Sequence, residues 1–327
     1  MKFLGTEIAP LGMGTWPIGG PFFDGDTPLG YANNEDGESI RALHAALDHG
    51  ITLFDTAAVY GAGHAERLLG KAFAGRDAMI VTKIGIGFDE VTKQVQFGQT
   101  DPAKVMPAID RCLARLQRNC VDMVLLHNNS LAVDEAAPIF DVMDRAIEAG
   151  KIRSYGWSTD YPASVSAMAG RDGFGAVQHA MNLFVDVPTI QGVAHEADLV
   201  TMLRSPLAMG VLSGKFTDAT VLPKGDIRAT KTDWEAYFMG GKVAPGYLDQ
   251  LAALRELLQS GGRTLPQGAL CWLMAKSPLN LPIPGARTVA QITDNAGAIS
   301  HGPLPDAVMQ EIERVIERAP EGPPRDR

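Results

Sequence analysis

Short apolar runs of strand length alternate with longer amphipathic stretches along most of the chain. The apolar runs lie at residues 8–16, 51–56, 79–83, 121–127, 152–158, 176–178, 199–206 and 280–284. Between them, apolar residues recur at steps of three or four, the spacing that gives a helix one apolar face. The clearest such stretches lie at residues 36–49, 102–118, 134–149 and 247–259. The pattern predicts eight strands that alternate with helices.

Strands that alternate with helices predict an α/β fold with a parallel sheet, because parallel neighbours need a long crossover connection. The count of eight favours a closed (β/α)8 TIM barrel over an open doubly wound sheet. We expect a single barrel domain over residues 1–327, since no linker rich in Ser, Gly or Pro divides the chain. The aperiodic stretch 214–246 is expected to be a functional loop over one face. The tail at 320–327 is expected to be disordered.

Composition and charge narrow the class of protein. Lys and Arg total 29 against 38 Asp and Glu, a net charge of -9, which argues against a basic surface for nucleic acid or anionic lipid. No apolar run approaches the roughly 18 residues of a spanning helix. The three cysteines form no CxxC pair, as expected in a reducing compartment. The seven histidines form no HExxH-type pair, so no metal site is expected. These features predict a soluble cytoplasmic protein.

Polar residues end several of the apolar runs, and in this barrel active sites form at the carboxyl ends of the strands. Asp55 ends one run with Tyr60 just beyond it, Lys83 ends the next, and His127 ends the one after. A charged residue there is costly unless it is paired or faces a cavity. For any one of these residues a purely structural role is the simpler interpretation. The four together at neighbouring strand ends favour proton transfer.

The expected roles follow from ordinary pKa values. A free tyrosine has a pKa of about 10, so we expect Lys83 to lower the pKa of Tyr60, and Asp55 to keep Lys83 charged. A histidine on the next strand, His127, can hydrogen-bond a carbonyl oxygen and orient it toward Tyr60. No side chain donates a hydride, so a cofactor must supply it.

Ordered motifs then point to a family. The segment FDTAAVYGAGHAERLLGKAF, followed by VTKIG, LLH, GWS, VQHAMN, SPLAMGVLSGKF and IPGARTVAQITDNAGA, resembles the aldo-keto reductase family over about residues 3–300. The resemblance implies that Tyr60 is the general acid, that Asp55 and Lys83 tune it, and that His127 orients the carbonyl. It also implies NADP(H) as the cofactor, with NAD(H) less favoured.

The resemblance assigns three groups of residues to the cofactor. The nicotinamide end would be held by Asp55, Ser158, Gln178, Asn182 and Arg204, with Trp16 at the end of the first apolar run added to the set. The pyrophosphate loop would comprise Ser205, Pro206, Leu207, Gly210, Leu212, Gly214 and Lys215. The adenosine end would comprise Pro284, Gly285, Ala286, Arg287, Gln291 and Asn295. Within it, Arg287 is expected to pair with a 2′-phosphate, and no acidic residue in GARTVAQ is placed to bind a free 2′-hydroxyl.

Three positions depart from the family pattern. Thr159 stands where an Asn usually follows the Ser of GWS, Arg204 stands where many members stack an aromatic ring, and NNSL follows His127.

The expected activity is reduction of a small aldehyde or ketone, or oxidation of the corresponding alcohol. Two alternatives stay open: a catalytically idle, nucleotide-sensing regulatory subunit, and an NAD-dependent sugar or polyol dehydrogenase.

Overall fold

Eight strands form one parallel sheet at the centre of the structure, a computed structural model that describes residues 1–230 and 237–321. Neighbouring strands pair in the order β16–β13–β12–β11–β10–β7–β6–β3. Their bounds are β3 (Met13–Gly14), β6 (Leu53–Asp55), β7 (Met79–Ile84), β10 (Val121–Leu126), β11 (Ile152–Ser158), β12 (Phe174–Ala180), β13 (Val200–Arg204) and β16 (Asn280–Pro282).

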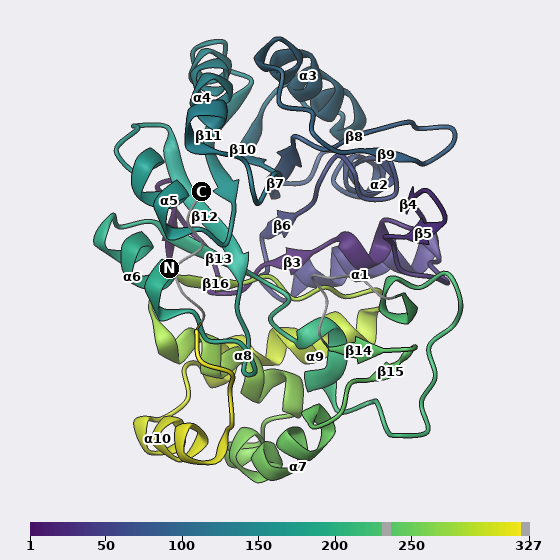
Figure 1. The fold of residues 1–327 in the computed structure, drawn as a ribbon, viewed down its shortest axis with the longest axis vertical. Helices are drawn as coiled ribbons and strands as arrows, with labels where there is room; N and C mark the ends of the chain where they lie inside the picture. The colour runs from purple at the N-terminus through teal and green to yellow at the C-terminus, as the bar shows by residue number, and fades with distance from the viewer. Residues whose placement is uncertain (231–236, 322–327) are drawn as a thin grey trace.

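The two ends of the sheet meet and close it. Gly12 donates its N–H to the carbonyl of Pro282 at 2.9 Å. Gly14 donates to the carbonyl of Pro284 at 3.0 Å and forms a parallel bridge with Gly285. The sheet curls round the centre of the molecule with the helices outside it (Figure 1). The predicted (β/α)8 barrel is therefore confirmed.

Helices follow the strands and cover the outer face of the barrel (Figure 1). They are α1 (Asp36–Asp48), α2 (His64–Ala72), α3 (Val105–Leu116), α4 (Val133–Glu148), α5 (Pro162–Met168), α6 (Pro188–Glu196), α7 (Tyr247–Leu258), α8 (Leu265–Lys276), α9 (Val289–His301) and α10 (Asp306–Val315). None of the described helices is both long enough and apolar enough to cross a membrane.

The apolar residues pack in two layers, one inside the barrel and one between the sheet and the helices. On β7, Val81 belongs to the inner cluster, whereas Ile80 and Ile84 belong to the outer one. Side chains alternate along a strand, so Lys83 shares the inward direction of Val81. The N-terminal hairpin, β1 (Lys2–Phe3) and β2 (Thr6–Glu7), adds Phe3 to the inner cluster.

The structure differs from the sequence prediction at element ends and in the loops. Residues 8–16 were expected as one strand, but only Met13–Gly14 is a strand, and Trp16–Ile18 forms a 3-10 turn with a proline in it. Short hairpins also lie between the main elements: β4 (Phe23–Asp24) with β5 (Thr27–Pro28), β8 (Gly87–Phe88) with β9 (Val95–Gln96), and β14 (Phe238–Met239) with β15 (Lys242–Val243).

The long loop expected at 214–246 therefore contains local structure, including a 3-10 turn at Ile227–Ala229 and the β14–β15 hairpin. Residues 231–236 of that loop and 322–327 of the expected disordered tail lie outside the described residues. Within the tail, Glu321 accepts a hydrogen bond from the hydroxyl of Thr189 at 2.7 Å.

Candidate active site

Asp55 and Lys83 form a buried ion pair at the carboxyl ends of β6 and β7. The Lys83 ammonium donates to Asp55 Oδ2 at 2.7 Å and to the carbonyl of Thr56 at 2.8 Å. On its other side Asp55 Oδ1 accepts from Gln178 Nε2 at 2.8 Å. Both oxygens of the carboxylate are therefore held, one by Lys83 and one by an amide from β12.

Tyr60 lies in the turn between β6 and α2, and its hydroxyl reaches the same ammonium. Lys83 Nζ donates to Tyr60 Oη at 3.4 Å. The turn depends on Gly61, whose φ is +61° and where a Cβ would lie 1.7 Å from the carbonyl oxygen of Gly19. The indole of Trp16 stacks beside the phenol, with ring centroids 6.1 Å apart and an interplanar angle of 19°.

Burial sets the electrostatics of this group. Burial raises the pKa of Tyr60, the charge of Asp55 raises it further, and Arg204 opposes the rise. Burial also raises the pKa of Asp55 and lowers the pKa of Lys83, and the attraction between the two partly offsets both changes. The pKa of Tyr60 therefore lies above its ordinary value and not below it as expected, because burial of the phenol and the charge of Asp55 outweigh the charge of Arg204.

His127 follows β10 and faces Tyr60. The two rings meet edge to face, with centroids 6.1 Å apart and an angle of 90°. Burial lowers the pKa of His127 well below its ordinary value, and Lys83 and Arg204 lower it further, so the ring is neutral at pH 7. A neutral imidazole carries one N–H that it can donate. His127 can thus donate to a carbonyl oxygen.

Arg204 ends β13 and forms an ion pair with Asp160. Asp160 Oδ1 in turn accepts from the backbone N–H of Ala180 at 3.0 Å. The charge of Arg204 shifts the pKa values of Tyr60 and His127. Its guanidinium therefore lies near the reacting groups, although Asp160 neutralises part of its charge.

The residues expected at the nicotinamide end are partly engaged with the protein. Ser158, at the end of β11, is buried. Asn182 Nδ2 donates to the carbonyl of Ser205 at 3.1 Å and to the hydroxyl of Tyr237 at 2.6 Å, and its Oδ1 accepts from Phe184 N at 3.0 Å. Both amide hydrogens of Asn182 are used, which leaves it one lone pair on Oδ1 for a ligand.

The segment after β13 has a strained backbone. Ser205, Ala208 and Met209 have φ of 54°, 47° and 51°, in the left-handed region that non-glycine residues rarely adopt, and Gly210 follows at 100°. Such conformations cost of order 1–3 kcal/mol each and cluster at ligand-binding sites. Pro206, Leu207, Leu212 and Gly214, from the predicted pyrophosphate loop, lie in or beside this segment.

Three cations gather beyond that segment. Although the Lys215 side chain reaches solvent, desolvation of its ammonium, together with Arg228 and Arg287, lowers the pKa of Lys215 to about 8. Burial and the charge of Arg228 also lower the pKa of Arg287. Asp226 pairs with Arg228 at 2.8 Å, so one carboxylate faces three cations and the cluster has an excess of positive charge.

The start of α9 carries the predicted adenosine residues and one unexpected partner. Arg287 Nη1 donates to the carbonyl of Ala32 at 2.9 Å, and its backbone N–H donates to Gln291 Oε1 at 2.8 Å. The next helical N–H, of Val289, donates to Glu38 Oε1 at 2.9 Å. That bond and Arg41 lower the pKa of Glu38. Pro284, Gly285 and Ala286 lead into the helix, and Asn295 is buried within it.

Comparison with known proteins decides the family. The model of the Aldo/keto reductase family matches residues 10–317. The chain belongs to the aldo/keto reductase family. Membership makes it an oxidoreductase.

Individual relatives cover most of the chain. Aldo-keto reductase YhdN of Bacillus subtilis is 28% identical over 295 residues, which is 88% of this chain and 84% of that protein. Aldo-keto reductase yakc [NADP(+)] of Schizosaccharomyces pombe is 27% identical over 298 residues, with the same two shares. The structure of the glycerol dehydrogenase AKR11B4 from Gluconobacter oxydans is similar with a TM-score of 0.77 and 26% identity, over 95% of this chain and 92% of that one.

Sequence reasoning missed several residues that lie beside the candidate site of this aldo/keto reductase. Arg228 and Asp226 lie in the stretch 214–246, which is expected to be a functional loop. The short run DIR is the one sequence signal for these two residues. Arg228 also stacks on Tyr31, 4.8 Å from its ring centroid. Glu38 lies on α1 and gave no signal, because its contact with Val289 joins positions 251 residues apart.

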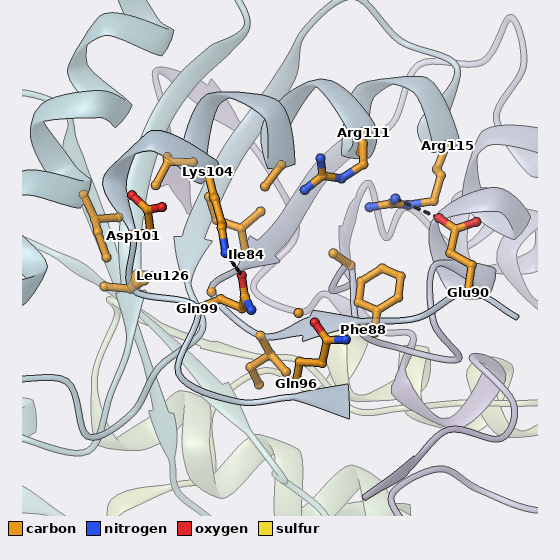
Figure 2. A pocket seen from close by; sticks show the side chains of 17 residues that line it. Ile84, Phe88, Glu90, Gln96, Gln99, Asp101, Lys104, Arg111, Arg115 and Leu126 are labelled. Carbon is orange, nitrogen blue, oxygen red and sulfur yellow. Dashed lines mark hydrogen bonds and ion pairs between the residues drawn. The ribbon is translucent and has the colours of Figure 1, made fainter. Parts of the chain in front are cut away.

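A separate cavity of about 250 Å³ lies outside the barrel wall. Figure 2 shows it between the β8–β9 hairpin, with Phe88 and Gln96, and α3, with Arg111 and Arg115. None of the predicted catalytic residues lines it in the described part of the chain. Its lining combines apolar side chains, such as Ile84 and Leu126, with charged ones, such as Lys104 and Arg111, and the proton-transfer set lies elsewhere, so this cavity is not the candidate active site.

Proposed function

We propose that this chain, a single barrel domain over residues 1–327, is an NADP(H)-dependent reductase of the cytoplasm that converts a small aldehyde or ketone to an alcohol, or catalyses the reverse oxidation. The observation that carries the proposal is one contiguous set of groups at the barrel mouth: a protonated phenol, a buried ammonium 3.4 Å from it, a carboxylate 2.7 Å from the ammonium, and a neutral imidazole facing the phenol. The three cysteines, none of them in a disulfide, support the location.

Carbonyl reduction adds a hydride to carbon and a proton to oxygen. When bound, the reduced nicotinamide supplies the hydride. His127 donates its single N–H to the carbonyl oxygen and orients it, and Tyr60 gives its hydroxyl proton to that oxygen. The phenolate left on Tyr60 then lies 3.4 Å from the Lys83 ammonium, which stabilises it. Asp55 keeps Lys83 charged and in place.

The residues beyond the barrel mouth fit a dinucleotide phosphate. The cluster of Lys215, Arg228 and Arg287 has more positive than negative charge, and the charges of Arg228 and Arg287 add to the desolvation that lowers the pKa of Lys215. An anion there would relieve the repulsion. The strained segment at Ser205–Gly210 supports the assignment of residues 205–215 to the pyrophosphate, and Arg287 to a 2′-phosphate. The similarity to a relative named for NADP(+) adds support.

One observation favours a second candidate, an NAD-dependent sugar or polyol dehydrogenase. The Glu38 carboxylate accepts a hydrogen bond from the first N–H of α9, that of Val289, two residues from Arg287. A carboxylate there repels a 2′-phosphate and can accept a hydrogen bond from a free 2′-hydroxyl. One similar structure is named a glycerol dehydrogenase.

Cofactor titration followed by turnover separates these functions. A charge-assisted contact of about 1.5–3 kcal/mol from Arg287 predicts roughly 10- to 150-fold tighter NADPH than NADH. Protein fluorescence would measure both affinities in the wild type and in Arg287→Ala, where most of the difference should vanish through weaker NADPH. Equal affinities in the wild type would favour the NAD-dependent candidate. Tight NADPH with no oxidation by any aldehyde or ketone would favour the regulatory subunit instead.

A further inference from the structure

A buried carboxylate on α2 is tied directly to the strand that carries Lys83. The Glu66 side chain is 0% exposed. Its Oε1 accepts a hydrogen bond from the hydroxyl of Thr82 at 2.6 Å. Thr82, also fully buried, immediately precedes Lys83 on β7 and points to the opposite, helix-facing side of the sheet. A single short bond therefore links α2 to the peptide that positions the ammonium.

The same helix is tied to Tyr60. Ala65, the neighbour of Glu66, donates its N–H to the carbonyl of Tyr60 at 3.2 Å. The turn between Tyr60 and α2 is short, and it passes through glycines at φ of +61° and +86°. The first turn of α2 is thus hydrogen-bonded to Tyr60 through its backbone and to the Lys83 strand through Glu66.

Arg115 on α3 fixes the second oxygen of Glu66. Its Nε donates to Glu66 Oε2 at 2.6 Å, and its Nη1 donates to Glu90 at 3.2 Å, a contact drawn in Figure 2. The Arg115 side chain fills the space beside Gly63, where a Cβ would lie 2.7 Å from Arg115 Cδ. Both carboxylate oxygens of Glu66 are therefore held, and the rotamer of the side chain is fixed.

A buried ion pair of this kind adds little to stability compared with apolar residues of the same volume, because desolvation offsets the attraction. Its best-supported value is in defining one arrangement of the groups around it. Here the arrangement at stake is the contact from Lys83 Nζ to Tyr60 Oη, at 3.4 Å the longest of the three bonds made by that ammonium. A small relative movement of α2 and β7 would break it.

We propose that Glu66, acting through the hydroxyl of Thr82, is a positioning residue that sets the distance between Tyr60 and Lys83. This role rests on the proposed function, in which Tyr60 is the proton donor and Lys83 stabilises its phenolate. Glu66 itself touches neither reacting group. The carboxylate acts by fixing the two chain segments that carry them.

Three threonine variants test the proposal without leaving a charge unpaired. Thr82→Val removes the hydroxyl and keeps the shape, Thr82→Ser keeps the hydroxyl, and Thr201→Val is the matched control. Thr201 is equally buried on β13 and donates to Asn280 Oδ1 at 2.6 Å, far along the sheet order from Tyr60 and Lys83. We expect kcat for an aldehyde to fall about 10-fold in Thr82→Val, since small misplacements of reacting groups are costly. The KM should change little, and Thr82→Ser should restore kcat.

A second measurement reports on Tyr60 independently of turnover. The chain has six tyrosines, so a ring-labelled carbon-13 spectrum is simple, and Tyr60→Phe identifies the Tyr60 signal. That signal should shift in Thr82→Val and stay in place in Thr82→Ser and Thr201→Val. The proposal is overturned if Thr82→Val keeps both its kcat and its Tyr60 signal while losing as much thermal stability as Thr201→Val. If the wild type reduces no carbonyl compound, the proposed function fails, and the spectrum still decides whether Glu66 and Thr82 position Tyr60.

Discussion

The environment of Tyr60 serves one direction of proton transfer better than the other. Burial and Asp55 keep the phenol protonated at neutral pH, which is the form that can donate to a carbonyl oxygen. In the proposed reaction, the cost appears after transfer, when a phenolate must exist in the same buried place. Lys83 at 3.4 Å and the nearby charge of Arg204 are the groups that offset that cost. The two cations thus act on the product of proton transfer more than on the resting phenol.

Replacing Tyr60 by Phe should remove the proton donor and little else. We expect kcat for a good aldehyde to fall 10²- to 10⁴-fold, the usual contribution of general acid catalysis. The NADPH dissociation constant, measured by fluorescence quenching, should stay within about twofold, because the phenol ring and its stacking on Trp16 remain. Retention of more than about half of kcat would show that another group supplies the proton.

Replacing Lys83 by Met should affect stability as well as catalysis. The Asp55 carboxylate would be left buried without its cation, and loss of one partner of such a pair costs about 3–5 kcal/mol. Without Lys83 the pKa of Asp55 rises further, so the folded state binds more protons than the unfolded one. The loss in free energy of unfolding, relative to the wild type, should therefore grow as pH rises from about 4 to 7.

Chemical denaturation at both pH values measures that deficit, with Asp55→Asn/Lys83→Met as the control. The double variant buries no unpaired charge and should regain most of the stability at pH 7, while remaining inactive. A Lys83→Met protein that is as stable as the wild type at both values, with an unchanged pH–rate profile, would contradict a role for the pair.

How far single residues could be predicted depends on where their partners lie. Asp55, Lys83 and His127 can be identified because each lies at the end of an apolar run, where a polar side chain is costly unless it is paired or faces a cavity. Glu38 and Glu66 stand on ordinary amphipathic helices, and only the fold brings them to Val289 and Thr82. The direction of the pKa change at Tyr60 also required the structure, because burial decided it.

At the scale of elements, two helices meet at the place where we expect cofactor choice to be decided. The start of α9 presents the positive end of its dipole and the Arg287 side chain to an anion. The first turn of α1 brings Glu38 to the same helix start, where its carboxylate accepts the N–H of Val289. The sequence of α9 alone predicts a preference for a 2′-phosphate, whereas the packing of α1 against α9 opposes it. We expect the cofactor preference to be the balance of the two.

Removing the charge of Glu38 should shift that balance toward NADPH. Glu38→Gln keeps an oxygen that can accept from Val289, so the helix start stays capped. We expect the NADPH affinity to rise about 3- to 10-fold, because a full negative charge near the phosphate is lost, and the NADH affinity to stay or fall. The control is Glu35→Gln, which removes the same charge from an exposed site that also contacts Arg41. Parallel changes for both cofactors, or an equal effect in Glu35→Gln, would exclude Glu38 as a determinant.

At the scale of the whole molecule, closure of the barrel joins the two ends of the site. The count of eight strands followed from the alternation of apolar runs and helices, and the closed sheet from that count. The position of closure did not follow, since hydrogen bonds between Gly12–Gly14 and Pro282–Pro284 leave no periodic trace. This contact sets Trp16 on one side and the start of α9 on the other.

Closure of the barrel should be sensitive to substitution of Gly14. A Cβ there would lie 2.8 Å from the carbonyl oxygen of Ile283, which is backbone and cannot turn away. Gly14→Ala should therefore separate the first and last strands and lower stability by about 1–3 kcal/mol, a fall of a few degrees in Tm for a chain of this length. NADPH binding should weaken too, because Gly285 and Arg287 follow the displaced strand.

Gly170→Ala is the control, since no atom lies within 4 Å of a Cβ there and its φ is not positive. It should leave both Tm and NADPH affinity unchanged or raise Tm slightly. An intact NADPH affinity in a destabilised Gly14→Ala would mean that the adenosine end does not depend on closure of the barrel.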